Sequence, residues 1–128
     1  MRVGLLLFFL LISLPQCAHK HQPVTLNQGQ RWQANPETTQ GIQTMLKAID
    51  QASAGGEPMD YTTLNIALQT AFQDIFKQCT MTGEAHNQLH NYLLPMKDLF
   101  AAVKSSTDQK AAVEKLKAYL QDYGTYFE

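Results

Sequence analysis

The sequence predicts an all-α protein: an antiparallel up-down four-helix bundle that follows an N-terminal signal peptide. Four segments repeat apolar residues at spacings of three and four, which places those residues on one face of a helix. The connections between these segments are short, and short connections favour antiparallel neighbours. No segment alternates apolar and polar residues as a half-buried strand does. A composition of 45% apolar and 16% charged residues suits a globular core.

Residues 1–18, MRVGLLLFFLLISLPQCA, are expected to form a signal peptide. Arg2 precedes an apolar run over residues 3–14, which is shorter than the roughly 20 residues of a membrane-spanning helix. Cleavage after Ala18 would give a periplasmic or secreted protein, whereas lipidation of Cys17 would anchor it to a membrane. No second long apolar run follows, so we expect no membrane span in the mature chain.

Residues 19–35 are polar without periodicity and are predicted to form an irregular lead segment. The bundle, residues 36–128, begins with a helix expected over 36–53. Asn35 is placed to cap this helix, and Pro36 suits the first helical position. The inward-facing residues of this helix are predicted to be Thr38, Ile42, Met45, Ile49 and Ala52.

The break SAGGEPM precedes a second helix, which is expected over 61–79 with Asp60 as its cap. The break TMTG separates it from a third helix, expected over 83–104 and capped by Thr82. Pro95 should kink this third helix without ending it, because the apolar spacing continues past the proline. The inward-facing residues are predicted to be Leu64, Leu68, Phe72, Ile75 and Cys79, then His86, Leu89, Leu93, Met96, Phe100 and Val103.

The stretch SSTDQ marks the last turn of the chain before a fourth helix, which is expected over 107–123. Ser106 and Gln109 have the spacing of a capping box, in which each side chain bonds a backbone N–H of the first turn. The inward-facing residues of this helix are predicted to be Val113, Leu116, Leu120 and Tyr123.

The only cysteine outside the predicted signal peptide lies in KQCTMTGEAHNQLHNYLLPM, together with two of the four histidines. Cys79 is the last inward-facing residue of the second helix, and His86 is the first of the third. His90 follows four residues later, on nearly the same helix face. Met81 lies in the turn between the helices. In an up-down bundle this turn shares one end with the start of the first helix, so we expect the cysteine and the two histidines to converge there.

Cys79, Met81, His86 and His90 are therefore the candidate metal ligands. Two imidazoles at positions i and i+4 can bind one ion, and a thiolate and a thioether add soft ligands that suit Cu(I). Copper is the predicted metal. Zinc, which also binds thiolate and imidazole, is the alternative. A structural role is open as well, because a buried cysteine can pack as a small hydrophobe and a buried histidine can bond a carbonyl.

Two stretches also carry a resemblance: RWQANPETTQGIQTM over 31–45, and QCTMTGEAHNQLHNYLLP over 78–95. Together they resemble a group of small exported bacterial helical proteins of unknown function. Those proteins pair a Trp-x-x-Asn lead segment with a Cys-x-Met-x-Gly-x-Ala-His-x-x-x-His turn. The resemblance covers about residues 31–127 of this chain. It implies a unit built around this turn and does not imply an activity.

The sequence thus predicts an exported protein that buffers, shuttles or senses copper, with an envelope protein as a further partner. A metal-free protein-binding or inhibitory module is the alternative, in which Tyr126 and Phe127 would be exposed and contribute to binding. A b-type haem protein, ligated by His86 or His90 and a methionine, is a minor alternative. An enzyme is not predicted, because no third residue is evident to orient a histidine beside Cys79. No nucleic-acid partner is expected, since the basic residues form no patch.

Overall fold

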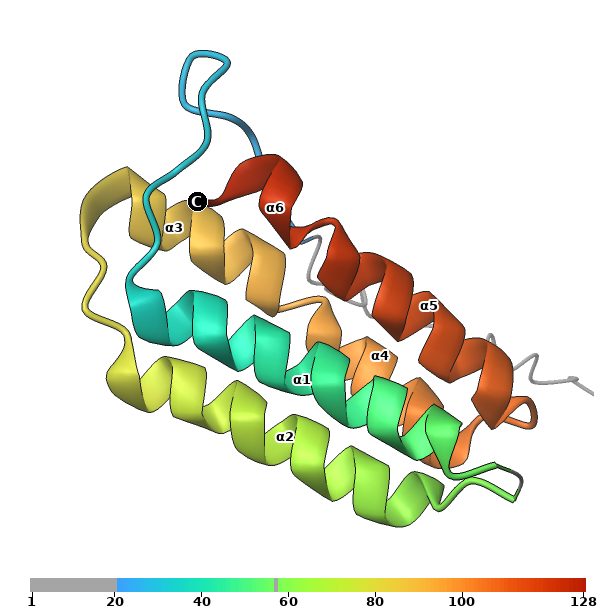
Figure 1. Ribbon diagram of the computed structural model, residues 1–128. Helices are drawn as coiled ribbons and strands as arrows, with labels where there is room; N and C mark the ends of the chain where they lie inside the picture. The colour runs from blue at the N-terminus through green and yellow to red at the C-terminus, as the bar shows by residue number, and fades with distance from the viewer. Residues whose placement is uncertain (1–20, 57) are drawn as a thin grey trace, which may run out of the picture.

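The computed structural model describes residues 21–56 and 58–128, which fold into an antiparallel bundle of helices (Figure 1). The predicted signal peptide, the candidate lipidation site Cys17 and the candidate cleavage position after Ala18 lie outside the described residues. Within the described residues, no helix is both long and apolar enough to cross a membrane. The helices are α1 (Pro36–Ala54), α2 (Tyr61–Gln78), α3 (Gly83–Leu93), α4 (Met96–Ser105), α5 (Gln109–Gln121) and α6 (Tyr123–Tyr126).

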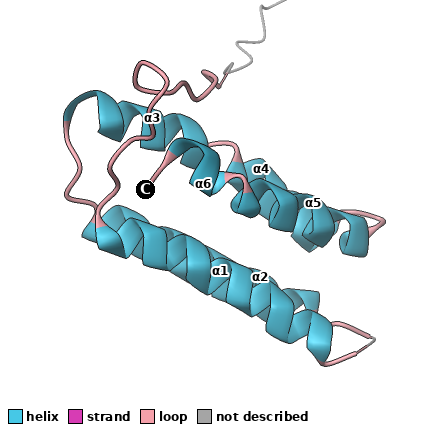
Figure 2. Ribbon diagram, turned by 45° about the horizontal axis from the view of Figure 1, so that its top comes forward, coloured by secondary structure: helices cyan, strands magenta, loops and turns pink. Residues whose placement is uncertain are grey.

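The helices pack as two layers, with α1 and α2 in one and α3 to α6 in the other (Figure 2). The helices α1 and α4 run in one direction and α2 and α5 in the other (Figure 1). Close contacts join α1 to α2 and α5, and join α4 to the same two helices. This arrangement confirms the predicted up-down four-helix bundle, in which α3 and α4 together form the third rod.

Pro95 divides the third rod into two helices, so the prediction of one kinked helix over 83–104 is wrong in this detail. Proline has no N–H to continue the helical hydrogen bonds. The Leu94 N–H still donates to the carbonyl four residues earlier, that of His90, at 3.0 Å. After the proline, the Lys97 N–H donates to the carbonyl only three residues earlier, that of Leu94, at 3.3 Å. Leu93 before the break and Met96 after it are both buried, so the apolar face of α3 continues into α4 as the spacing predicts.

Two of the predicted caps have different outcomes. Asp60 caps α2 as predicted, because its carboxylate accepts a hydrogen bond from the Thr63 N–H at 3.0 Å. Thr82 occupies the N-cap position of α3 as predicted, but its side chain forms no capping hydrogen bond. The first residue of α3 is instead Gly83 with φ of 64°, a left-handed conformation that glycine adopts without strain.

The capping box predicted from Ser106 and Gln109 is also wrong, and the fourth helix begins at residue 109. Asp108 caps it, since its carboxylate accepts from the Ala111 N–H at 2.9 Å. The Gln109 side chain points back and donates to the Val103 carbonyl at 2.9 Å. Gln109 therefore satisfies a carbonyl at the end of α4, where helical partners are missing.

Residues 32–34 of the lead segment pair with residues 126–128 at the C-terminus, in the manner of two parallel strands. The Trp32 N–H donates to the Tyr126 carbonyl at 2.8 Å, the Glu128 N–H to the Trp32 carbonyl at 2.9 Å, and the Ala34 N–H to the Glu128 carbonyl at 2.8 Å. The side chain of Phe127 is only 1% exposed, and that of Tyr126 is half-buried. The expectation that Phe127 would be exposed for partner binding is therefore wrong: pairing with the lead segment turns it into the core.

A reciprocal tyrosine pair fastens α3 to α5. The Tyr92 hydroxyl donates to the Tyr119 carbonyl at 2.7 Å, and the Tyr119 hydroxyl donates to the Tyr92 carbonyl at the same distance. Their rings stack with centroids 4.9 Å apart. Burial raises the pKa of both phenols, that of Tyr119 to about 12, so both remain hydrogen-bond donors at physiological pH.

Gly41 lies in the interior of α1 where this helix packs against α2. A Cβ at this position would overlap Cγ1 of Ile75 and lie 2.8 Å from its Cδ1. The two helices therefore reach their observed separation at this level because position 41 carries no side chain.

Gly41→Ala should lower the free energy of unfolding, although alanine is the better helix former by about 1 kcal/mol. Overpacking against Ile75 should outweigh that gain, since overpacked cores lose about 1–3 kcal/mol. In an Ile75→Ala background the same substitution should become stabilising, because the clash is gone. Urea unfolding of the two single variants and the double variant measures this coupling. Additive effects of the two substitutions would contradict the close-packing explanation.

Candidate metal centre

The predicted ligands lie at the end of the bundle where α2 ends and α1 and α3 begin (Figure 1). Cys79 follows α2 directly and has an extended backbone, with φ of −66° and ψ of 121°. Its thiol is free and half-buried. The connection then runs through Met81, which is half-buried and packs against the core. Three residues of non-helical backbone thus separate Cys79 from α3.

The structure brings the cysteine and the two histidines together. The Cys79 Sγ lies 3.6 Å from Nδ1 of His86. The rings of His86 and His90 have centroids 4.4 Å apart, because the two residues are one helical turn apart on α3. Both imidazoles are half-buried. Among the described residues, no group of three or more His, Cys, Asp or Glu side chains is spaced to hold a metal ion. The Cys79–His86 contact is therefore the centre of the site.

The His90 ring is held between a histidine and a phenylalanine. Its other neighbour is the ring of Phe76 on α2, edge-on with centroids 5.6 Å apart. Burial lowers the pKa of His90, and the charge that His86 would carry lowers it further. The imidazole of His90 is therefore held in its neutral form, which is the form that binds a metal.

Asn35 positions the cysteine, a role that the sequence analysis missed. Its amide Nδ2 donates to the Gln78 carbonyl at 3.2 Å and to Oε2 of Glu37 at 2.9 Å, and its Oδ1 accepts from the Thr38 hydroxyl at 2.7 Å. Asn35 occupies the N-cap position of α1 as predicted, but its side chain forms no capping hydrogen bond. The side chain instead ties the start of α1 to the residue before Cys79.

A second tether fixes the first turns of α3. The Trp32 indole N–H donates to the Thr25 carbonyl at 2.6 Å, and the Thr25 N–H donates to Oε1 of Gln88 at 2.8 Å. The Gln88 amide in turn donates to Oε1 of Glu84 at 2.7 Å. Gln88 is buried, although glutamine is usually exposed. No local pattern in the sequence indicates this burial. These bonds hold the helical turn that carries His86 against the lead segment.

No protein-family model, curated protein or solved structure matches this chain.

Asn35→Ala should destabilise the connection between Cys79 and His86 selectively. Loss of the amide leaves the Gln78 carbonyl without this partner, at a cost of about 1–3 kcal/mol. Amide hydrogen exchange over residues 79–86 should accelerate more than exchange in α5. Asn87→Ala, which removes an exposed amide from α3, is the matched control and should change little. Uniform acceleration across the bundle would show that Asn35 does not hold this connection in particular.

The metal-free protein should lose stability as the pH falls below about 6.5, in part through His90. The folded state lowers the pKa of His90, so the unfolded state binds the proton more readily and stability falls with pH through this window. Above about 6.5 the contribution should be flat. Urea unfolding of His90→Gln at pH 7.5 and 5.5 should show a smaller loss than the wild type. His21→Gln, at an exposed histidine, is the control; equal losses in all three proteins would rule out His90 as the source.

Proposed function

We propose that this chain is an exported periplasmic metal-binding protein that holds copper as Cu(I) and buffers, shuttles or senses the ion. The observation that supports the proposal is the 3.6 Å separation of Cys79 Sγ and His86 Nδ1. A metal about 2.3 Å from a sulfur and about 2.0 Å from a nitrogen separates these two donors by about 3.5 Å at a tetrahedral angle and by about 3.7 Å at a trigonal one. The two donor atoms are thus already at the spacing that a shared ion requires.

Each ligand would have a distinct role. The Cys79 thiolate would be the anionic anchor, and His86 and His90 would supply neutral imidazoles. Met81 lies in the non-helical connection, and its thioether would be the soft, neutral ligand. Export is inferred from the apolar run over residues 3–14, ahead of the described part of the chain.

The ligand set favours copper over zinc. Structural zinc sites are almost always tetrahedral, with four Cys, His, Asp or Glu ligands. The described residues hold no group of even three such side chains spaced for one ion, so an ion would bind Cys79 and His86 as they stand, and His90 would join them only after its ring turns. Cu(I) accepts a lower coordination number and binds thioether as well as thiolate and imidazole. Zinc therefore enters the experiment as the competing metal.

The Cys79–His86 contact also favours a second candidate, in which the cluster is structural and the protein carries no metal. A thiol and an imidazole nitrogen at 3.6 Å can share a hydrogen bond. In that case the contact would only fix the connection between α2 and α3.

Cys79→Ser should weaken Cu(I) binding by about 100-fold or more, and Met81→Leu by about tenfold or less. A thiolate is an anionic ligand that loses its proton on binding, whereas a thioether is a neutral one. Competition titration against a chromogenic Cu(I) chelator, with Zn(II) titrated in parallel, measures both affinities. Small and equal effects of the two substitutions would mean that the sulfur atoms only pack.

His86→Leu separates the two candidates. If His86 is a ligand, this substitution abolishes tight Cu(I) binding and leaves the metal-free protein at least as stable, because an apolar side chain replaces a half-buried polar one. If His86 is structural, the metal-free protein loses about 1–3 kcal/mol because the Cys79 thiol loses its partner. A thermal melt of metal-free His86→Leu beside the same titration decides between them. Clear destabilisation with wild-type copper affinity would overturn the proposal.

A further inference from the structure

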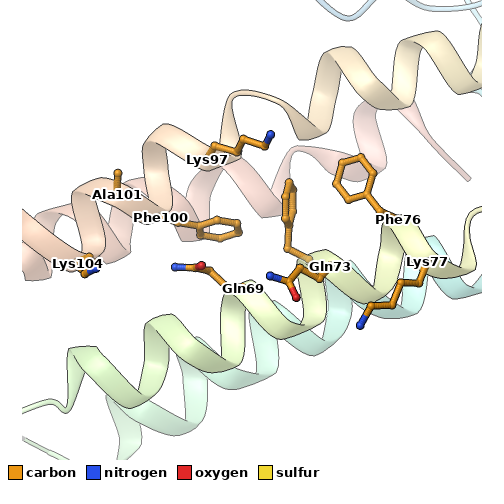
Figure 3. Close-up of a pocket in the computed structure, with 9 residues that line it drawn as sticks. Gln69, Gln73, Phe76, Lys77, Lys97, Phe100, Ala101 and Lys104 are labelled. Carbon is orange, nitrogen blue, oxygen red and sulfur yellow. The ribbon is translucent and has the colours of Figure 1, made fainter.

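A groove with an aromatic floor runs between α2 and α4, and one of its lining residues, Phe76, also contacts the ring of His90. It encloses a cavity of about 740 Å³. Figure 3 shows the rings of Phe76 and Phe100 in the space between the two helices, with Gln69 and Gln73 extending from α2. The lining residues are Gln69, Phe72, Gln73, Phe76, Lys77, Lys97, Phe100, Ala101 and Lys104.

The groove gathers the large apolar side chains that the bundle leaves exposed on α2. Among the described residues only three large hydrophobic side chains are exposed, and two of them belong to this face: Ile66, 63% exposed, and Phe76, 38% exposed. Ile66 lines an adjoining cavity of about 280 Å³ that shares Gln69 and Lys104 with the first. The two cavities therefore form one groove along α2 from Tyr61 to Lys77, which spans about 24 Å at 1.5 Å per residue.

A buried acceptor in this groove has no partner. Asn65 lines the adjoining cavity and is 5% exposed, and its Oδ1 atom accepts no hydrogen bond in the described part of the chain. Buried polar atoms are nearly always bonded, so an unpaired one calls for an explanation. A donor group on an occupant of the groove would supply the missing bond.

The charge of the groove points to an acidic occupant. Its lining includes three lysines and neither aspartate nor glutamate, although the whole chain has a net charge of −1. Lys77 is paired with Asp74 at 3.1 Å. Lys97 and Lys104 form no ion pair with any described residue. They are seven residues apart, so both lie on one face of α4, separated by about two turns.

We propose that this groove binds an amphipathic helix of a partner protein that carries acidic residues beside its apolar stripe. The lysines are spread along the groove, so they match an occupant that carries negative charges at several positions along its length. A single anionic head group would instead be matched by cations gathered at one end of the groove. Apolar side chains spaced at i, i+3, i+4 and i+7 would lie on Phe72, Phe76 and Phe100, as in other helix-in-groove complexes. A span of about 24 Å corresponds to about 16 helical residues.

The test uses synthetic helices of about 16 residues, a length set by the span of the groove. One has leucines at i, i+3, i+4 and i+7 flanked by glutamates, and the other has lysines in place of the glutamates. The full chain is titrated with each while amide and side-chain NMR shifts are followed. The acidic helix should bind at least tenfold more tightly, with shifts confined to α2 and α4. Equal affinity for both helices, shifts elsewhere, or no binding of either at millimolar concentration would overturn the proposal.

Variants locate the interaction. Lys97→Glu combined with Lys104→Glu should weaken binding of the acidic helix at least tenfold and remove its preference over the basic one. Lys47→Glu combined with Lys115→Glu makes the same charge change at exposed positions on α1 and α5 and should leave the affinity unchanged. Decanoate is titrated separately. If decanoate shifts the groove residues and neither helix does, the groove is a site for an anionic amphiphile and the proposal fails.

Discussion

The hydrogen bond from the Asn35 amide to the Gln78 carbonyl is the constraint on which this end of the molecule depends. The last carbonyls of any helix lack partners within the helix. Here one of those at the end of α2 is satisfied by Asn35, the residue that precedes α1. The side chain that makes this bond is 9% exposed, so water competes poorly for the carbonyl. The bond therefore sets where the chain leaves α2 and so where Cys79 lies.

Because the chain leaves α2 in an extended conformation, α3 stands away from α2 (Figure 2). It is held instead by side chains on its other faces. The Tyr92 pair fastens it to α5, and Gln88 fastens it to the lead segment. This placement brings His86 to the thiol of Cys79 while α2 and α4 keep the groove between them open.

Sequence patterns predicted the elements that depend on local spacing. The inward faces of the four rods, the Asp60 cap and the approach of His86 to His90 all follow from helical periodicity and from bonds a few residues apart. Interactions between distant segments were not predictable in this way. The buried position of Phe127 depends on pairing across almost the whole described chain, which no window of sequence reports. Asn35 occupies the N-cap position that its residue type predicts, but its Oδ1 accepts from the Thr38 hydroxyl, and no pattern indicates that its amide bonds the distant Gln78 carbonyl.

The groove was missed for a related reason. Its existence depends on how far apart α2 and α4 lie, whereas periodicity identifies only which residues of each helix face inward. Phe76 follows the inward residue Ile75 directly, so the pattern marks it as flanking the core. In the structure its ring packs edge-on against His90 and also lines the groove. One aromatic side chain therefore borders both proposed sites. If binding at one site changes affinity at the other, the effect must be equal in both directions, and the contact between Phe76 and His90 joins the two sites directly.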